Sequence, residues 1–294
     1  MDAAIAEEEK EEEKVDVFDM AAEKEILNIF NAEWIGGLAE LKKWNEKSDK
    51  MVQVQTEADT PKLMPGDYSA LFEALKKFAG DAHATVSQNA IKAMGNLAKG
   101  LRASFKDHCK AASPLLMQKF KERRLVPDIM TTLENFMMCL ELADLVETIA
   151  AEFNNQKPKA IPAVKVNILT FIEKAILITN IDMIEDIKDA IMPTIMAGIE
   201  EKDGPCRDQA AKVIGILVAR LGENAMAKQI EKLNKSQQAK MTETKDAYKP
   251  CKYDKSARKE AAKAKAAAKA PVKKPALSSG KSTAPKKAAV VVEE

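Results

Sequence analysis

The residues of this chain that could bind a partner are basic side chains and one tryptophan, all at short polar turns. In chain order they are Trp44 with Lys42, Lys43 and Lys47, then Lys121, Arg123 and Arg124, then Lys165 and Arg207. Ammonium and guanidinium groups attract acidic surfaces, and tryptophan is enriched among the residues that dominate binding energy. The pattern therefore predicts non-covalent binding to an acidic protein surface.

Nothing in the sequence resembles a catalytic centre. His83 and His108 lie far apart and have no cysteine or carboxylate nearby at the spacing of metal ligands. The glycine-rich motifs that bind phosphate groups are missing, as is the G-x-S-x-G motif of hydrolases. We therefore expect a protein that is not an enzyme, with no cofactor, no metal and no small-molecule substrate.

Each of these turn residues also has a purely structural interpretation. Trp44 could be a core tryptophan at a helix start, although its lysine neighbours favour an exposed position. The basic run of Lys121, Arg123 and Arg124 could be no more than a solvated surface. Lys165 or Arg207 could pair within its own repeat, and Arg207 has Asp203 and Asp208 close by. The functional interpretation depends on all of them sharing one edge.

The elements that position these residues are helices repeating at roughly 40 residues, which is typical of HEAT or armadillo solenoids. Two copies of one pattern lie between Ala160 and Gly222, each with a polar turn, a basic residue and an apolar helix. A weaker copy has the turn at 81–85, followed by an apolar stripe at Val86, Ala90, Ala93, Leu97 and Leu101. Stacked repeats bring their turns together along one edge.

Composition and charge divide the chain into three parts. We expect an acidic disordered segment at 1–20, a helical domain at 21–250, and a disordered basic tail rich in Lys, Ala, Pro and Ser at 251–294. The four cysteines are widely spaced, the first residues are acidic rather than a signal peptide, and no apolar run approaches the length of a membrane span. The simplest expectation is a reduced, intracellular, soluble all-α protein.

Local signals also predict particular helix limits. We expect short helices at 23–30 and 33–41, a helix beginning after Ser113 as its N-cap, and a new helical segment beginning at Pro193. A polar closing helix or helix pair is expected at 223–249.

Five short motifs, in order, resemble one known family. The first is Lys42-Lys43-Trp44-Asn45-Glu46-Lys47, which is similar to K-K-W-x-E-R. The second joins Pro65-Gly66-Asp67-Tyr68 with Ala74-Leu75-Lys76-Lys77. The third is Leu97-Ala98-Lys99-Gly100-Leu101-Arg102 with Phe105, and the fourth is Lys119-Phe120-Lys121-Glu122-Arg123-Arg124. The fifth, Pro205-Cys206-Arg207-Asp208, resembles P-E-V-R-D with one residue missing. Residues 21–249 thus resemble a TOG domain of the ch-TOG/Msps class of microtubule polymerases, and the second TOG domain most of all.

This resemblance implies six HEAT repeats in a flat paddle that binds curved αβ-tubulin through the turns within the repeats. Trp44 and the turn at 81–86 would face β-tubulin, the basic run would lie in the middle, and Lys165 and Arg207 would face α-tubulin. The residues implied in tubulin binding are Lys43, Trp44, Lys47, Asp81, Thr85, Val86, Lys121, Arg123, Arg124, Lys165, Lys202 and Arg207.

The resulting hypothesis is a tubulin-binding protein that promotes or regulates microtubule growth, with its basic tail holding it near the microtubule lattice. It would act in the cytoplasm on microtubules, at the spindle or its poles, without a membrane partner. The alternative is a HEAT-repeat adaptor for another acidic partner, with the tail binding nucleic acid. A third possibility is a TOG scaffold that has lost its affinity for tubulin.

Overall fold

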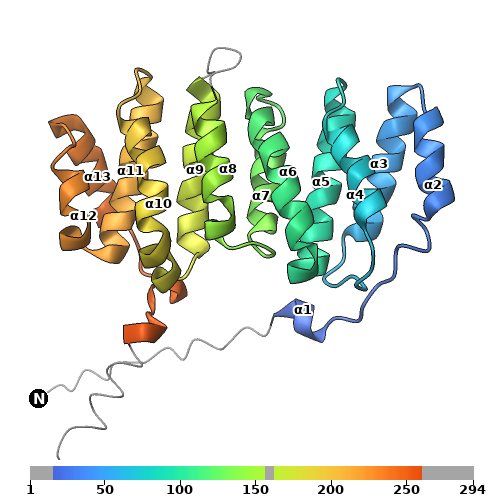
Figure 1. The fold of residues 1–294 in the computed structure, drawn as a ribbon, viewed down its shortest axis with the longest axis horizontal. Coiled ribbons are helices and arrows are strands. Elements are labelled where there is room, and N and C mark those ends of the chain that lie inside the picture. Colours follow the sequence, from blue (N-terminus) through green and yellow to red (C-terminus); the bar gives the residue numbers. More distant parts are fainter. Residues whose placement is uncertain (1–15, 156–161, 260–294) are drawn as a thin grey trace, which may run out of the picture. The chain divides into compact units, whose positions relative to one another are not determined.

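The computed structural model describes residues 16–155 and 162–259 of the 294-residue chain. This part of the chain is helical and contains no β-strand. Its one β-type pairing is an isolated bridge between Lys24 and Leu63. After a short α1 (Val17–Met20), the helices form six successive pairs, which confirms the expected all-α solenoid (Figure 1). The pairs are α2 (Ala32–Gly37) with α3 (Trp44–Ala58), α4 (Ser69–Ala79) with α5 (Ala84–Leu101), α6 (Lys106–Gln118) with α7 (Val126–Phe136), α8 (Leu142–Asn154) with α9 (Pro162–Ile178), α10 (Ile181–Ile199) with α11 (Gly204–Leu221), and α12 (Glu223–Ile230) with α13 (Lys235–Ala247).

The pairs stack so that their helices form two layers. The second helices, from α3 to α13, contact one another in succession, and the first helices from α2 to α10 do the same on the other side. The turns inside the pairs consequently lie along one edge, the upper one in Figure 1. We call this the turn edge; it consists of residues 41–43, 80–83, 119–125, 200–203 and 231–234, with the first residues of the helix after each.

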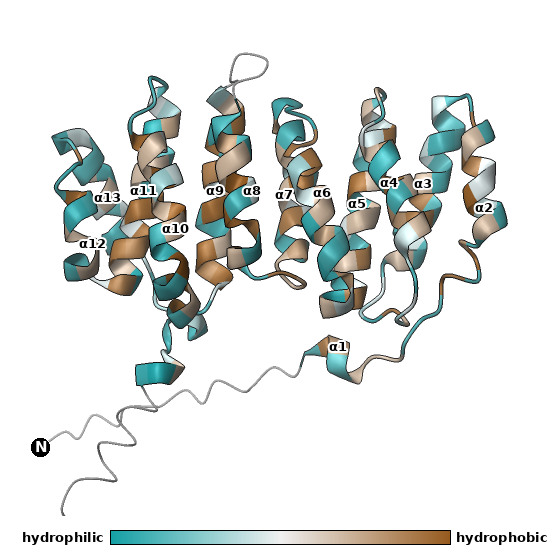
Figure 2. Cartoon of the chain, viewed as in Figure 1, coloured by the Kyte–Doolittle hydropathy of each residue, from teal (hydrophilic) through white to brown (hydrophobic). Residues whose placement is uncertain are grey.

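The core runs between the two layers. Apolar positions recur at helical spacing, so each helix turns one stripe toward its partner and its neighbours. Hydrophobic residues gather along the helices, while most of the turns are hydrophilic (Figure 2). Phenylalanines from successive elements fill much of the core with fully buried side chains: Phe30, Phe72, Phe105, Phe120, Phe136, Phe153 and Phe171.

Polar bonds between side chain and backbone join neighbouring second helices. From α7, Thr132 Oγ1 donates to the Ile91 carbonyl of α5 at 3.0 Å, and Asn135 Nδ2 donates to the Gly95 carbonyl at 3.2 Å. Gly95 allows this approach, because a Cβ atom there would lie 2.9 Å from Thr132 Oγ1. Cys139 is buried, and its Sγ donates to the Ala98 carbonyl.

Three local expectations were wrong. Residues 23–30 form turns instead of a helix, since the backbone of Lys24 bonds to the 62–64 segment. Ser113 and Pro114 lie inside α6, where Ser113 Oγ bonds to the Cys109 carbonyl rather than capping a new helix. Pro193 likewise lies inside α10.

The described array is longer at both ends than the expected limits of 21 and 250. At the start, Asp16 pairs with Arg102 at 3.0 Å, and the Phe18 ring lies 4.9 Å from the Arg102 guanidinium. At the other end, the array unit extends to Ser256. A second compact unit begins at Ala257, and only its residues 257–259 are described. The disorder expected for the rest of 1–20 and 251–294 concerns residues outside the described part.

The segment after α13 is fixed by a buried arginine. The Arg220 side chain is 0% exposed, pairs with Asp254, and donates to the Thr179 and Tyr253 carbonyls at 3.0 and 2.8 Å. Asp254 also accepts from Tyr248 Oη and from the Cys251 backbone, each at 2.8 Å. Although burial raises the pKa of Asp254, these hydrogen bonds and the guanidinium outweigh it and lower the pKa.

No helix of the described residues is both long and apolar enough to cross a membrane.

Replacing Asp254 with Asn should lower the free energy of unfolding by about 3 kcal/mol at neutral pH, because Arg220 would stay buried without its counter-charge. Since the folded-state pKa of Asp254 is lowered, its contribution is present above the unfolded value of about 4 and is lost as the pH falls below that. Denaturant titrations at pH 7 and pH 3 would measure this. Asp246→Asn, at an exposed pair with Lys245, is the control and should change stability by no more than about 0.5 kcal/mol. Equal effects of the two variants would contradict the stabilising role of the Arg220–Asp254 ion pair, which we call the latch.

Gly215→Ala should destabilise the last repeat, because a Cβ atom there would lie 2.6 Å from the Met241 carbonyl oxygen of α13. We expect a loss of about 1–3 kcal/mol, which thermal and denaturant unfolding would detect. Gly36→Ala is the matched control, since no atom lies within 4 Å of its Cβ position. That variant should be neutral or up to about 1 kcal/mol more stable, as alanine favours a helix.

Candidate functional site

The first turn presents the tryptophan. Trp44 is the first residue of α3 and is 51% exposed, as its lysine neighbours suggested. Its indole stacks on the His83 ring, with centroids 4.2 Å apart and planes 12° apart. Lys43 is exposed and pairs loosely with Glu46 at 3.2 Å. The turn thus offers a large apolar surface beside a cation.

The second turn is tied to the first by an ion pair. Lys47 Nζ lies 3.0 Å from Asp81 Oδ2, while Asp81 Oδ1 accepts from the His83 backbone at 2.8 Å. Burial raises the pKa of Asp81, but the hydrogen bond from His83 and the Lys47 ammonium outweigh it, so the pKa lies below its ordinary value. Lys47 and Asp81 are therefore largely engaged with each other. Thr85 is exposed at the start of α5.

Val86 does not fit the predicted site. Its side chain is 0% exposed and belongs to the core, so the expectation that it contacts a partner is wrong. It is the first member of the apolar stripe of α5, and that position turns it inward.

The third turn carries free positive charge. Lys121, Arg123 and Arg124 are all exposed, and within the described residues none of them has a hydrogen bond or ion pair through its side chain. Their neighbour Lys119 is buried and pairs with Glu122 at 2.9 Å, which anchors the turn from inside. Three cations without partners among the described residues, all on one short turn, would attract an anionic surface.

Lys165 was expected to face a partner, and the structure contradicts this. The residue lies in α9 and is 6% exposed, its ammonium pairs with Glu201, and it lies 5.1 Å from the centre of the Phe153 ring. The charge is thus used to join the fourth and fifth repeats. The turn preceding it, 156–161, lies outside the described residues.

At the fifth turn the cations divide their roles. Lys202 is exposed. Arg207 folds back and donates through Nη1 to the carbonyls of Glu201 and Lys202, at 2.9 and 2.6 Å. It therefore holds its own turn, in line with the structural alternative, although through carbonyls and not through Asp203 or Asp208.

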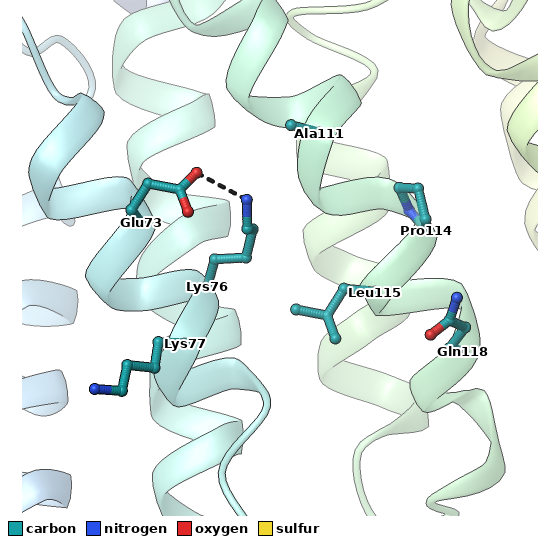
Figure 3. A pocket seen from close by; sticks show the side chains of 7 residues that line it. All are labelled: Glu73, Lys76, Lys77, Ala111, Pro114, Leu115 and Gln118. Atoms are coloured by element: carbon teal, nitrogen blue, oxygen red, sulfur yellow. Dashed lines mark hydrogen bonds and ion pairs between the residues drawn. The ribbon is translucent and has the colours of Figure 1, made fainter.

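The grooves between helices differ from the turn edge. One of about 430 Å³ lies between α4 and α6 and is lined by Glu73, Lys76, Lys77, Ala111, Pro114, Leu115 and Gln118. Lys76 is bonded to Glu73, while Lys77 points away from the groove and Leu115 points into it (Figure 3). These side chains offer no nucleophile paired with a base, so the groove does not suggest a reaction.

Sequence reasoning missed His83. Only its distance from possible metal ligands was weighed, whereas its role is contact with Trp44 across two repeats. The available signal was its place in the second turn, two residues after Asp81.

No family model matches the chain, but individual proteins are similar to it in sequence. Protein MOR1 of Arabidopsis thaliana is 27% identical over 235 residues, centrosomal protein 224 of Dictyostelium discoideum 29% over 231, and protein mini spindles of Drosophila melanogaster 26% over 237. These matches cover 79%, 76% and 80% of this chain. The chain spans only 12%, 11% and 12% of those relatives.

Solved structures show the same similarity at the level of the fold. A chain from work on microtubule plus end tracking by XMAP215, CLIP-170 and EB1 superposes with a TM-score of 0.70 at 25% identity, covering 79% of this chain and 96% of that one. The TOG3 domain of Drosophila melanogaster mini spindles has the same fold, with a TM-score of 0.60 at 12% identity over 76% of this chain and 97% of that one. The helical array of this chain therefore has the fold of a TOG domain, and its sequence is similar to MOR1 and mini spindles.

Proposed function

We propose that this chain binds αβ-tubulin through its turn edge and thereby promotes or regulates microtubule growth, without catalysing a reaction. The observation that carries the proposal is the exposed Trp44 on the same edge as Lys121, Arg123 and Arg124, which have no ion pair among the described residues. An apolar anchor beside cations fits an acidic protein surface. The relatives named for spindles and centrosomes support a place on the microtubule cytoskeleton.

The contact we propose is concentrated on the first three turns. Lys165 is buried against Glu201, and Arg207 is bound to its own turn, so Lys202 is the exposed one of the three cations predicted at the fourth and fifth repeats. Lys43, Trp44 and Thr85 at the first two turns would contact one tubulin subunit, and the basic third turn would lie at the middle. Lys47 and Asp81 would support this contact from inside through their ion pair.

The basic stretch 260–294, outside the described residues, would add a second attachment. We propose that its lysines hold the chain near the acidic microtubule surface and so raise its local concentration there. This attachment depends on charge alone, so it should weaken steeply with salt. Binding through the turn edge should be less sensitive to salt, because it would also bury Trp44 against the partner.

The test measures the affinity of the chain for purified tubulin dimer. Trp44→Ala should weaken binding about 30-fold or more, as expected of a central aromatic anchor. Replacing Lys121, Arg123 and Arg124 together by Glu should abolish detectable complex in size-exclusion chromatography. All four side chains are exposed, so circular dichroism and the melting temperature should be unchanged.

The matched control changes the same net charge elsewhere. Lys110, Lys249 and Lys255 are exposed and lie away from the turn edge, and their replacement by Glu should leave the affinity within about threefold. If both triple variants lose binding equally, attraction is non-specific and the turn edge is not the site.

A second arm compares residues 16–259 with the full chain at low and moderate salt. The shorter chain keeps the Arg220–Asp254 latch and should still form a one-to-one complex with tubulin. Binding by the full chain alone, fading with salt, would contradict a functional turn edge.

A further inference from the structure

The contact between Trp44 and His83 joins two repeats. Trp44 begins α3, whereas His83 precedes α5, and their rings stack at 4.2 Å with only 12° between their planes. Stacking against His83 covers part of the indole, and about half of the residue stays exposed. The rotation of an exposed tryptophan about its side-chain bonds is therefore limited by a neighbour from the next repeat.

His83 is itself fixed in place. Its backbone N–H donates to Asp81 Oδ1, and the other carboxylate oxygen of Asp81 bonds to Lys47. Lys47 lies three residues after Trp44, so both side chains leave α3 from the same face. These contacts form a closed loop of residues. It runs from Trp44 through His83, Asp81 and Lys47 back to α3.

Burying the His83 ring costs free energy that burying an apolar ring would not, because the imidazole carries polar nitrogen atoms. Its Nδ1 is buried and has no hydrogen-bond partner among the described residues. Buried polar atoms without partners are rare, and each calls for a physical reason. The contact with Trp44 uses the flat face of the ring and not this nitrogen, and a flat ring packed against the indole limits its orientation.

We propose that His83 is a positioning residue that holds the indole of Trp44 in its binding orientation. The inference rests on the proposed function, since it assumes that Trp44 contacts tubulin. A side chain that is already ordered loses less conformational entropy when a partner binds. His83 would thus raise affinity while lying beneath the contact, which makes recognition at the first turn dependent on the second repeat.

The free chain provides a test that needs no partner. In His83→Ala, the fluorescence of Trp44 should shift to longer wavelength and become more accessible to iodide. Trp34 is the only other tryptophan, and subtracting the spectrum of Trp44→Phe removes its contribution. An unchanged Trp44 spectrum in His83→Ala would overturn the inference.

The binding test separates positioning from a merely structural role. His83→Ala should weaken tubulin binding about three- to tenfold, as expected for the loss of one aromatic contact. His83→Phe, which restores a flat ring, should recover the affinity to within about threefold. In the Trp44→Ala background, His83→Ala should have no further effect, since the residue acts through the indole.

His108 is the matched control, because it also packs on aromatic rings, those of Phe72 and Phe105, but away from the turn edge. His108→Ala should leave both the Trp44 spectrum and the affinity unchanged. If Trp44→Ala loses binding while His83→Ala keeps it, the positioning role is wrong and the proposed function stands. If Trp44→Ala binds normally, both fail.

Discussion

The close approach of neighbouring second helices is the constraint on which the rest of the structure depends. Thr132 can reach the Ile91 carbonyl only because Gly95 has no side chain between α5 and α7. The same need recurs at Gly215, where α13 lies against α11. Tight packing of this layer sets the spacing of the repeats, and that spacing brings the turns into one edge. Binding residues far apart in the sequence therefore share a surface.

The repeat architecture was predictable because apolar residues recur at helical spacing in every pair. The residues at which the helices begin and end were harder to predict. Pro114 and Pro193 suggested new helix starts, yet both lie inside helices, since tertiary packing outweighs the loss of one backbone hydrogen bond. The latch at Asp254 lay in a stretch whose composition suggested only a tail. Its partner Arg220 is 34 residues earlier, and no local pattern links them.

The candidate site shows a similar division. The exposure of Trp44 followed from its lysine neighbours, and the basic third turn followed from its own composition. Val86 was assigned to the site although its place in the apolar stripe already implied burial. Lys165 could not be judged from its neighbours, because its partner Glu201 lies in the next repeat. The contact of His83 with Trp44 also crosses repeats, so the place of His83 in the second turn was the one available signal of its role.

Basic residues at equivalent places in the repeats perform two different tasks. Lys165 and Arg207 are used inside the array, where one joins two repeats and the other closes its turn. Arg123 and Arg124 have no such duty among the described residues and remain available. A cation that has a partner within the fold gives up that attraction if it turns outward, so it offers little net energy to a ligand. Among the described repeats, free positive charge is therefore available at the third turn and not at Lys165 or Arg207, and a partner would gain binding energy there.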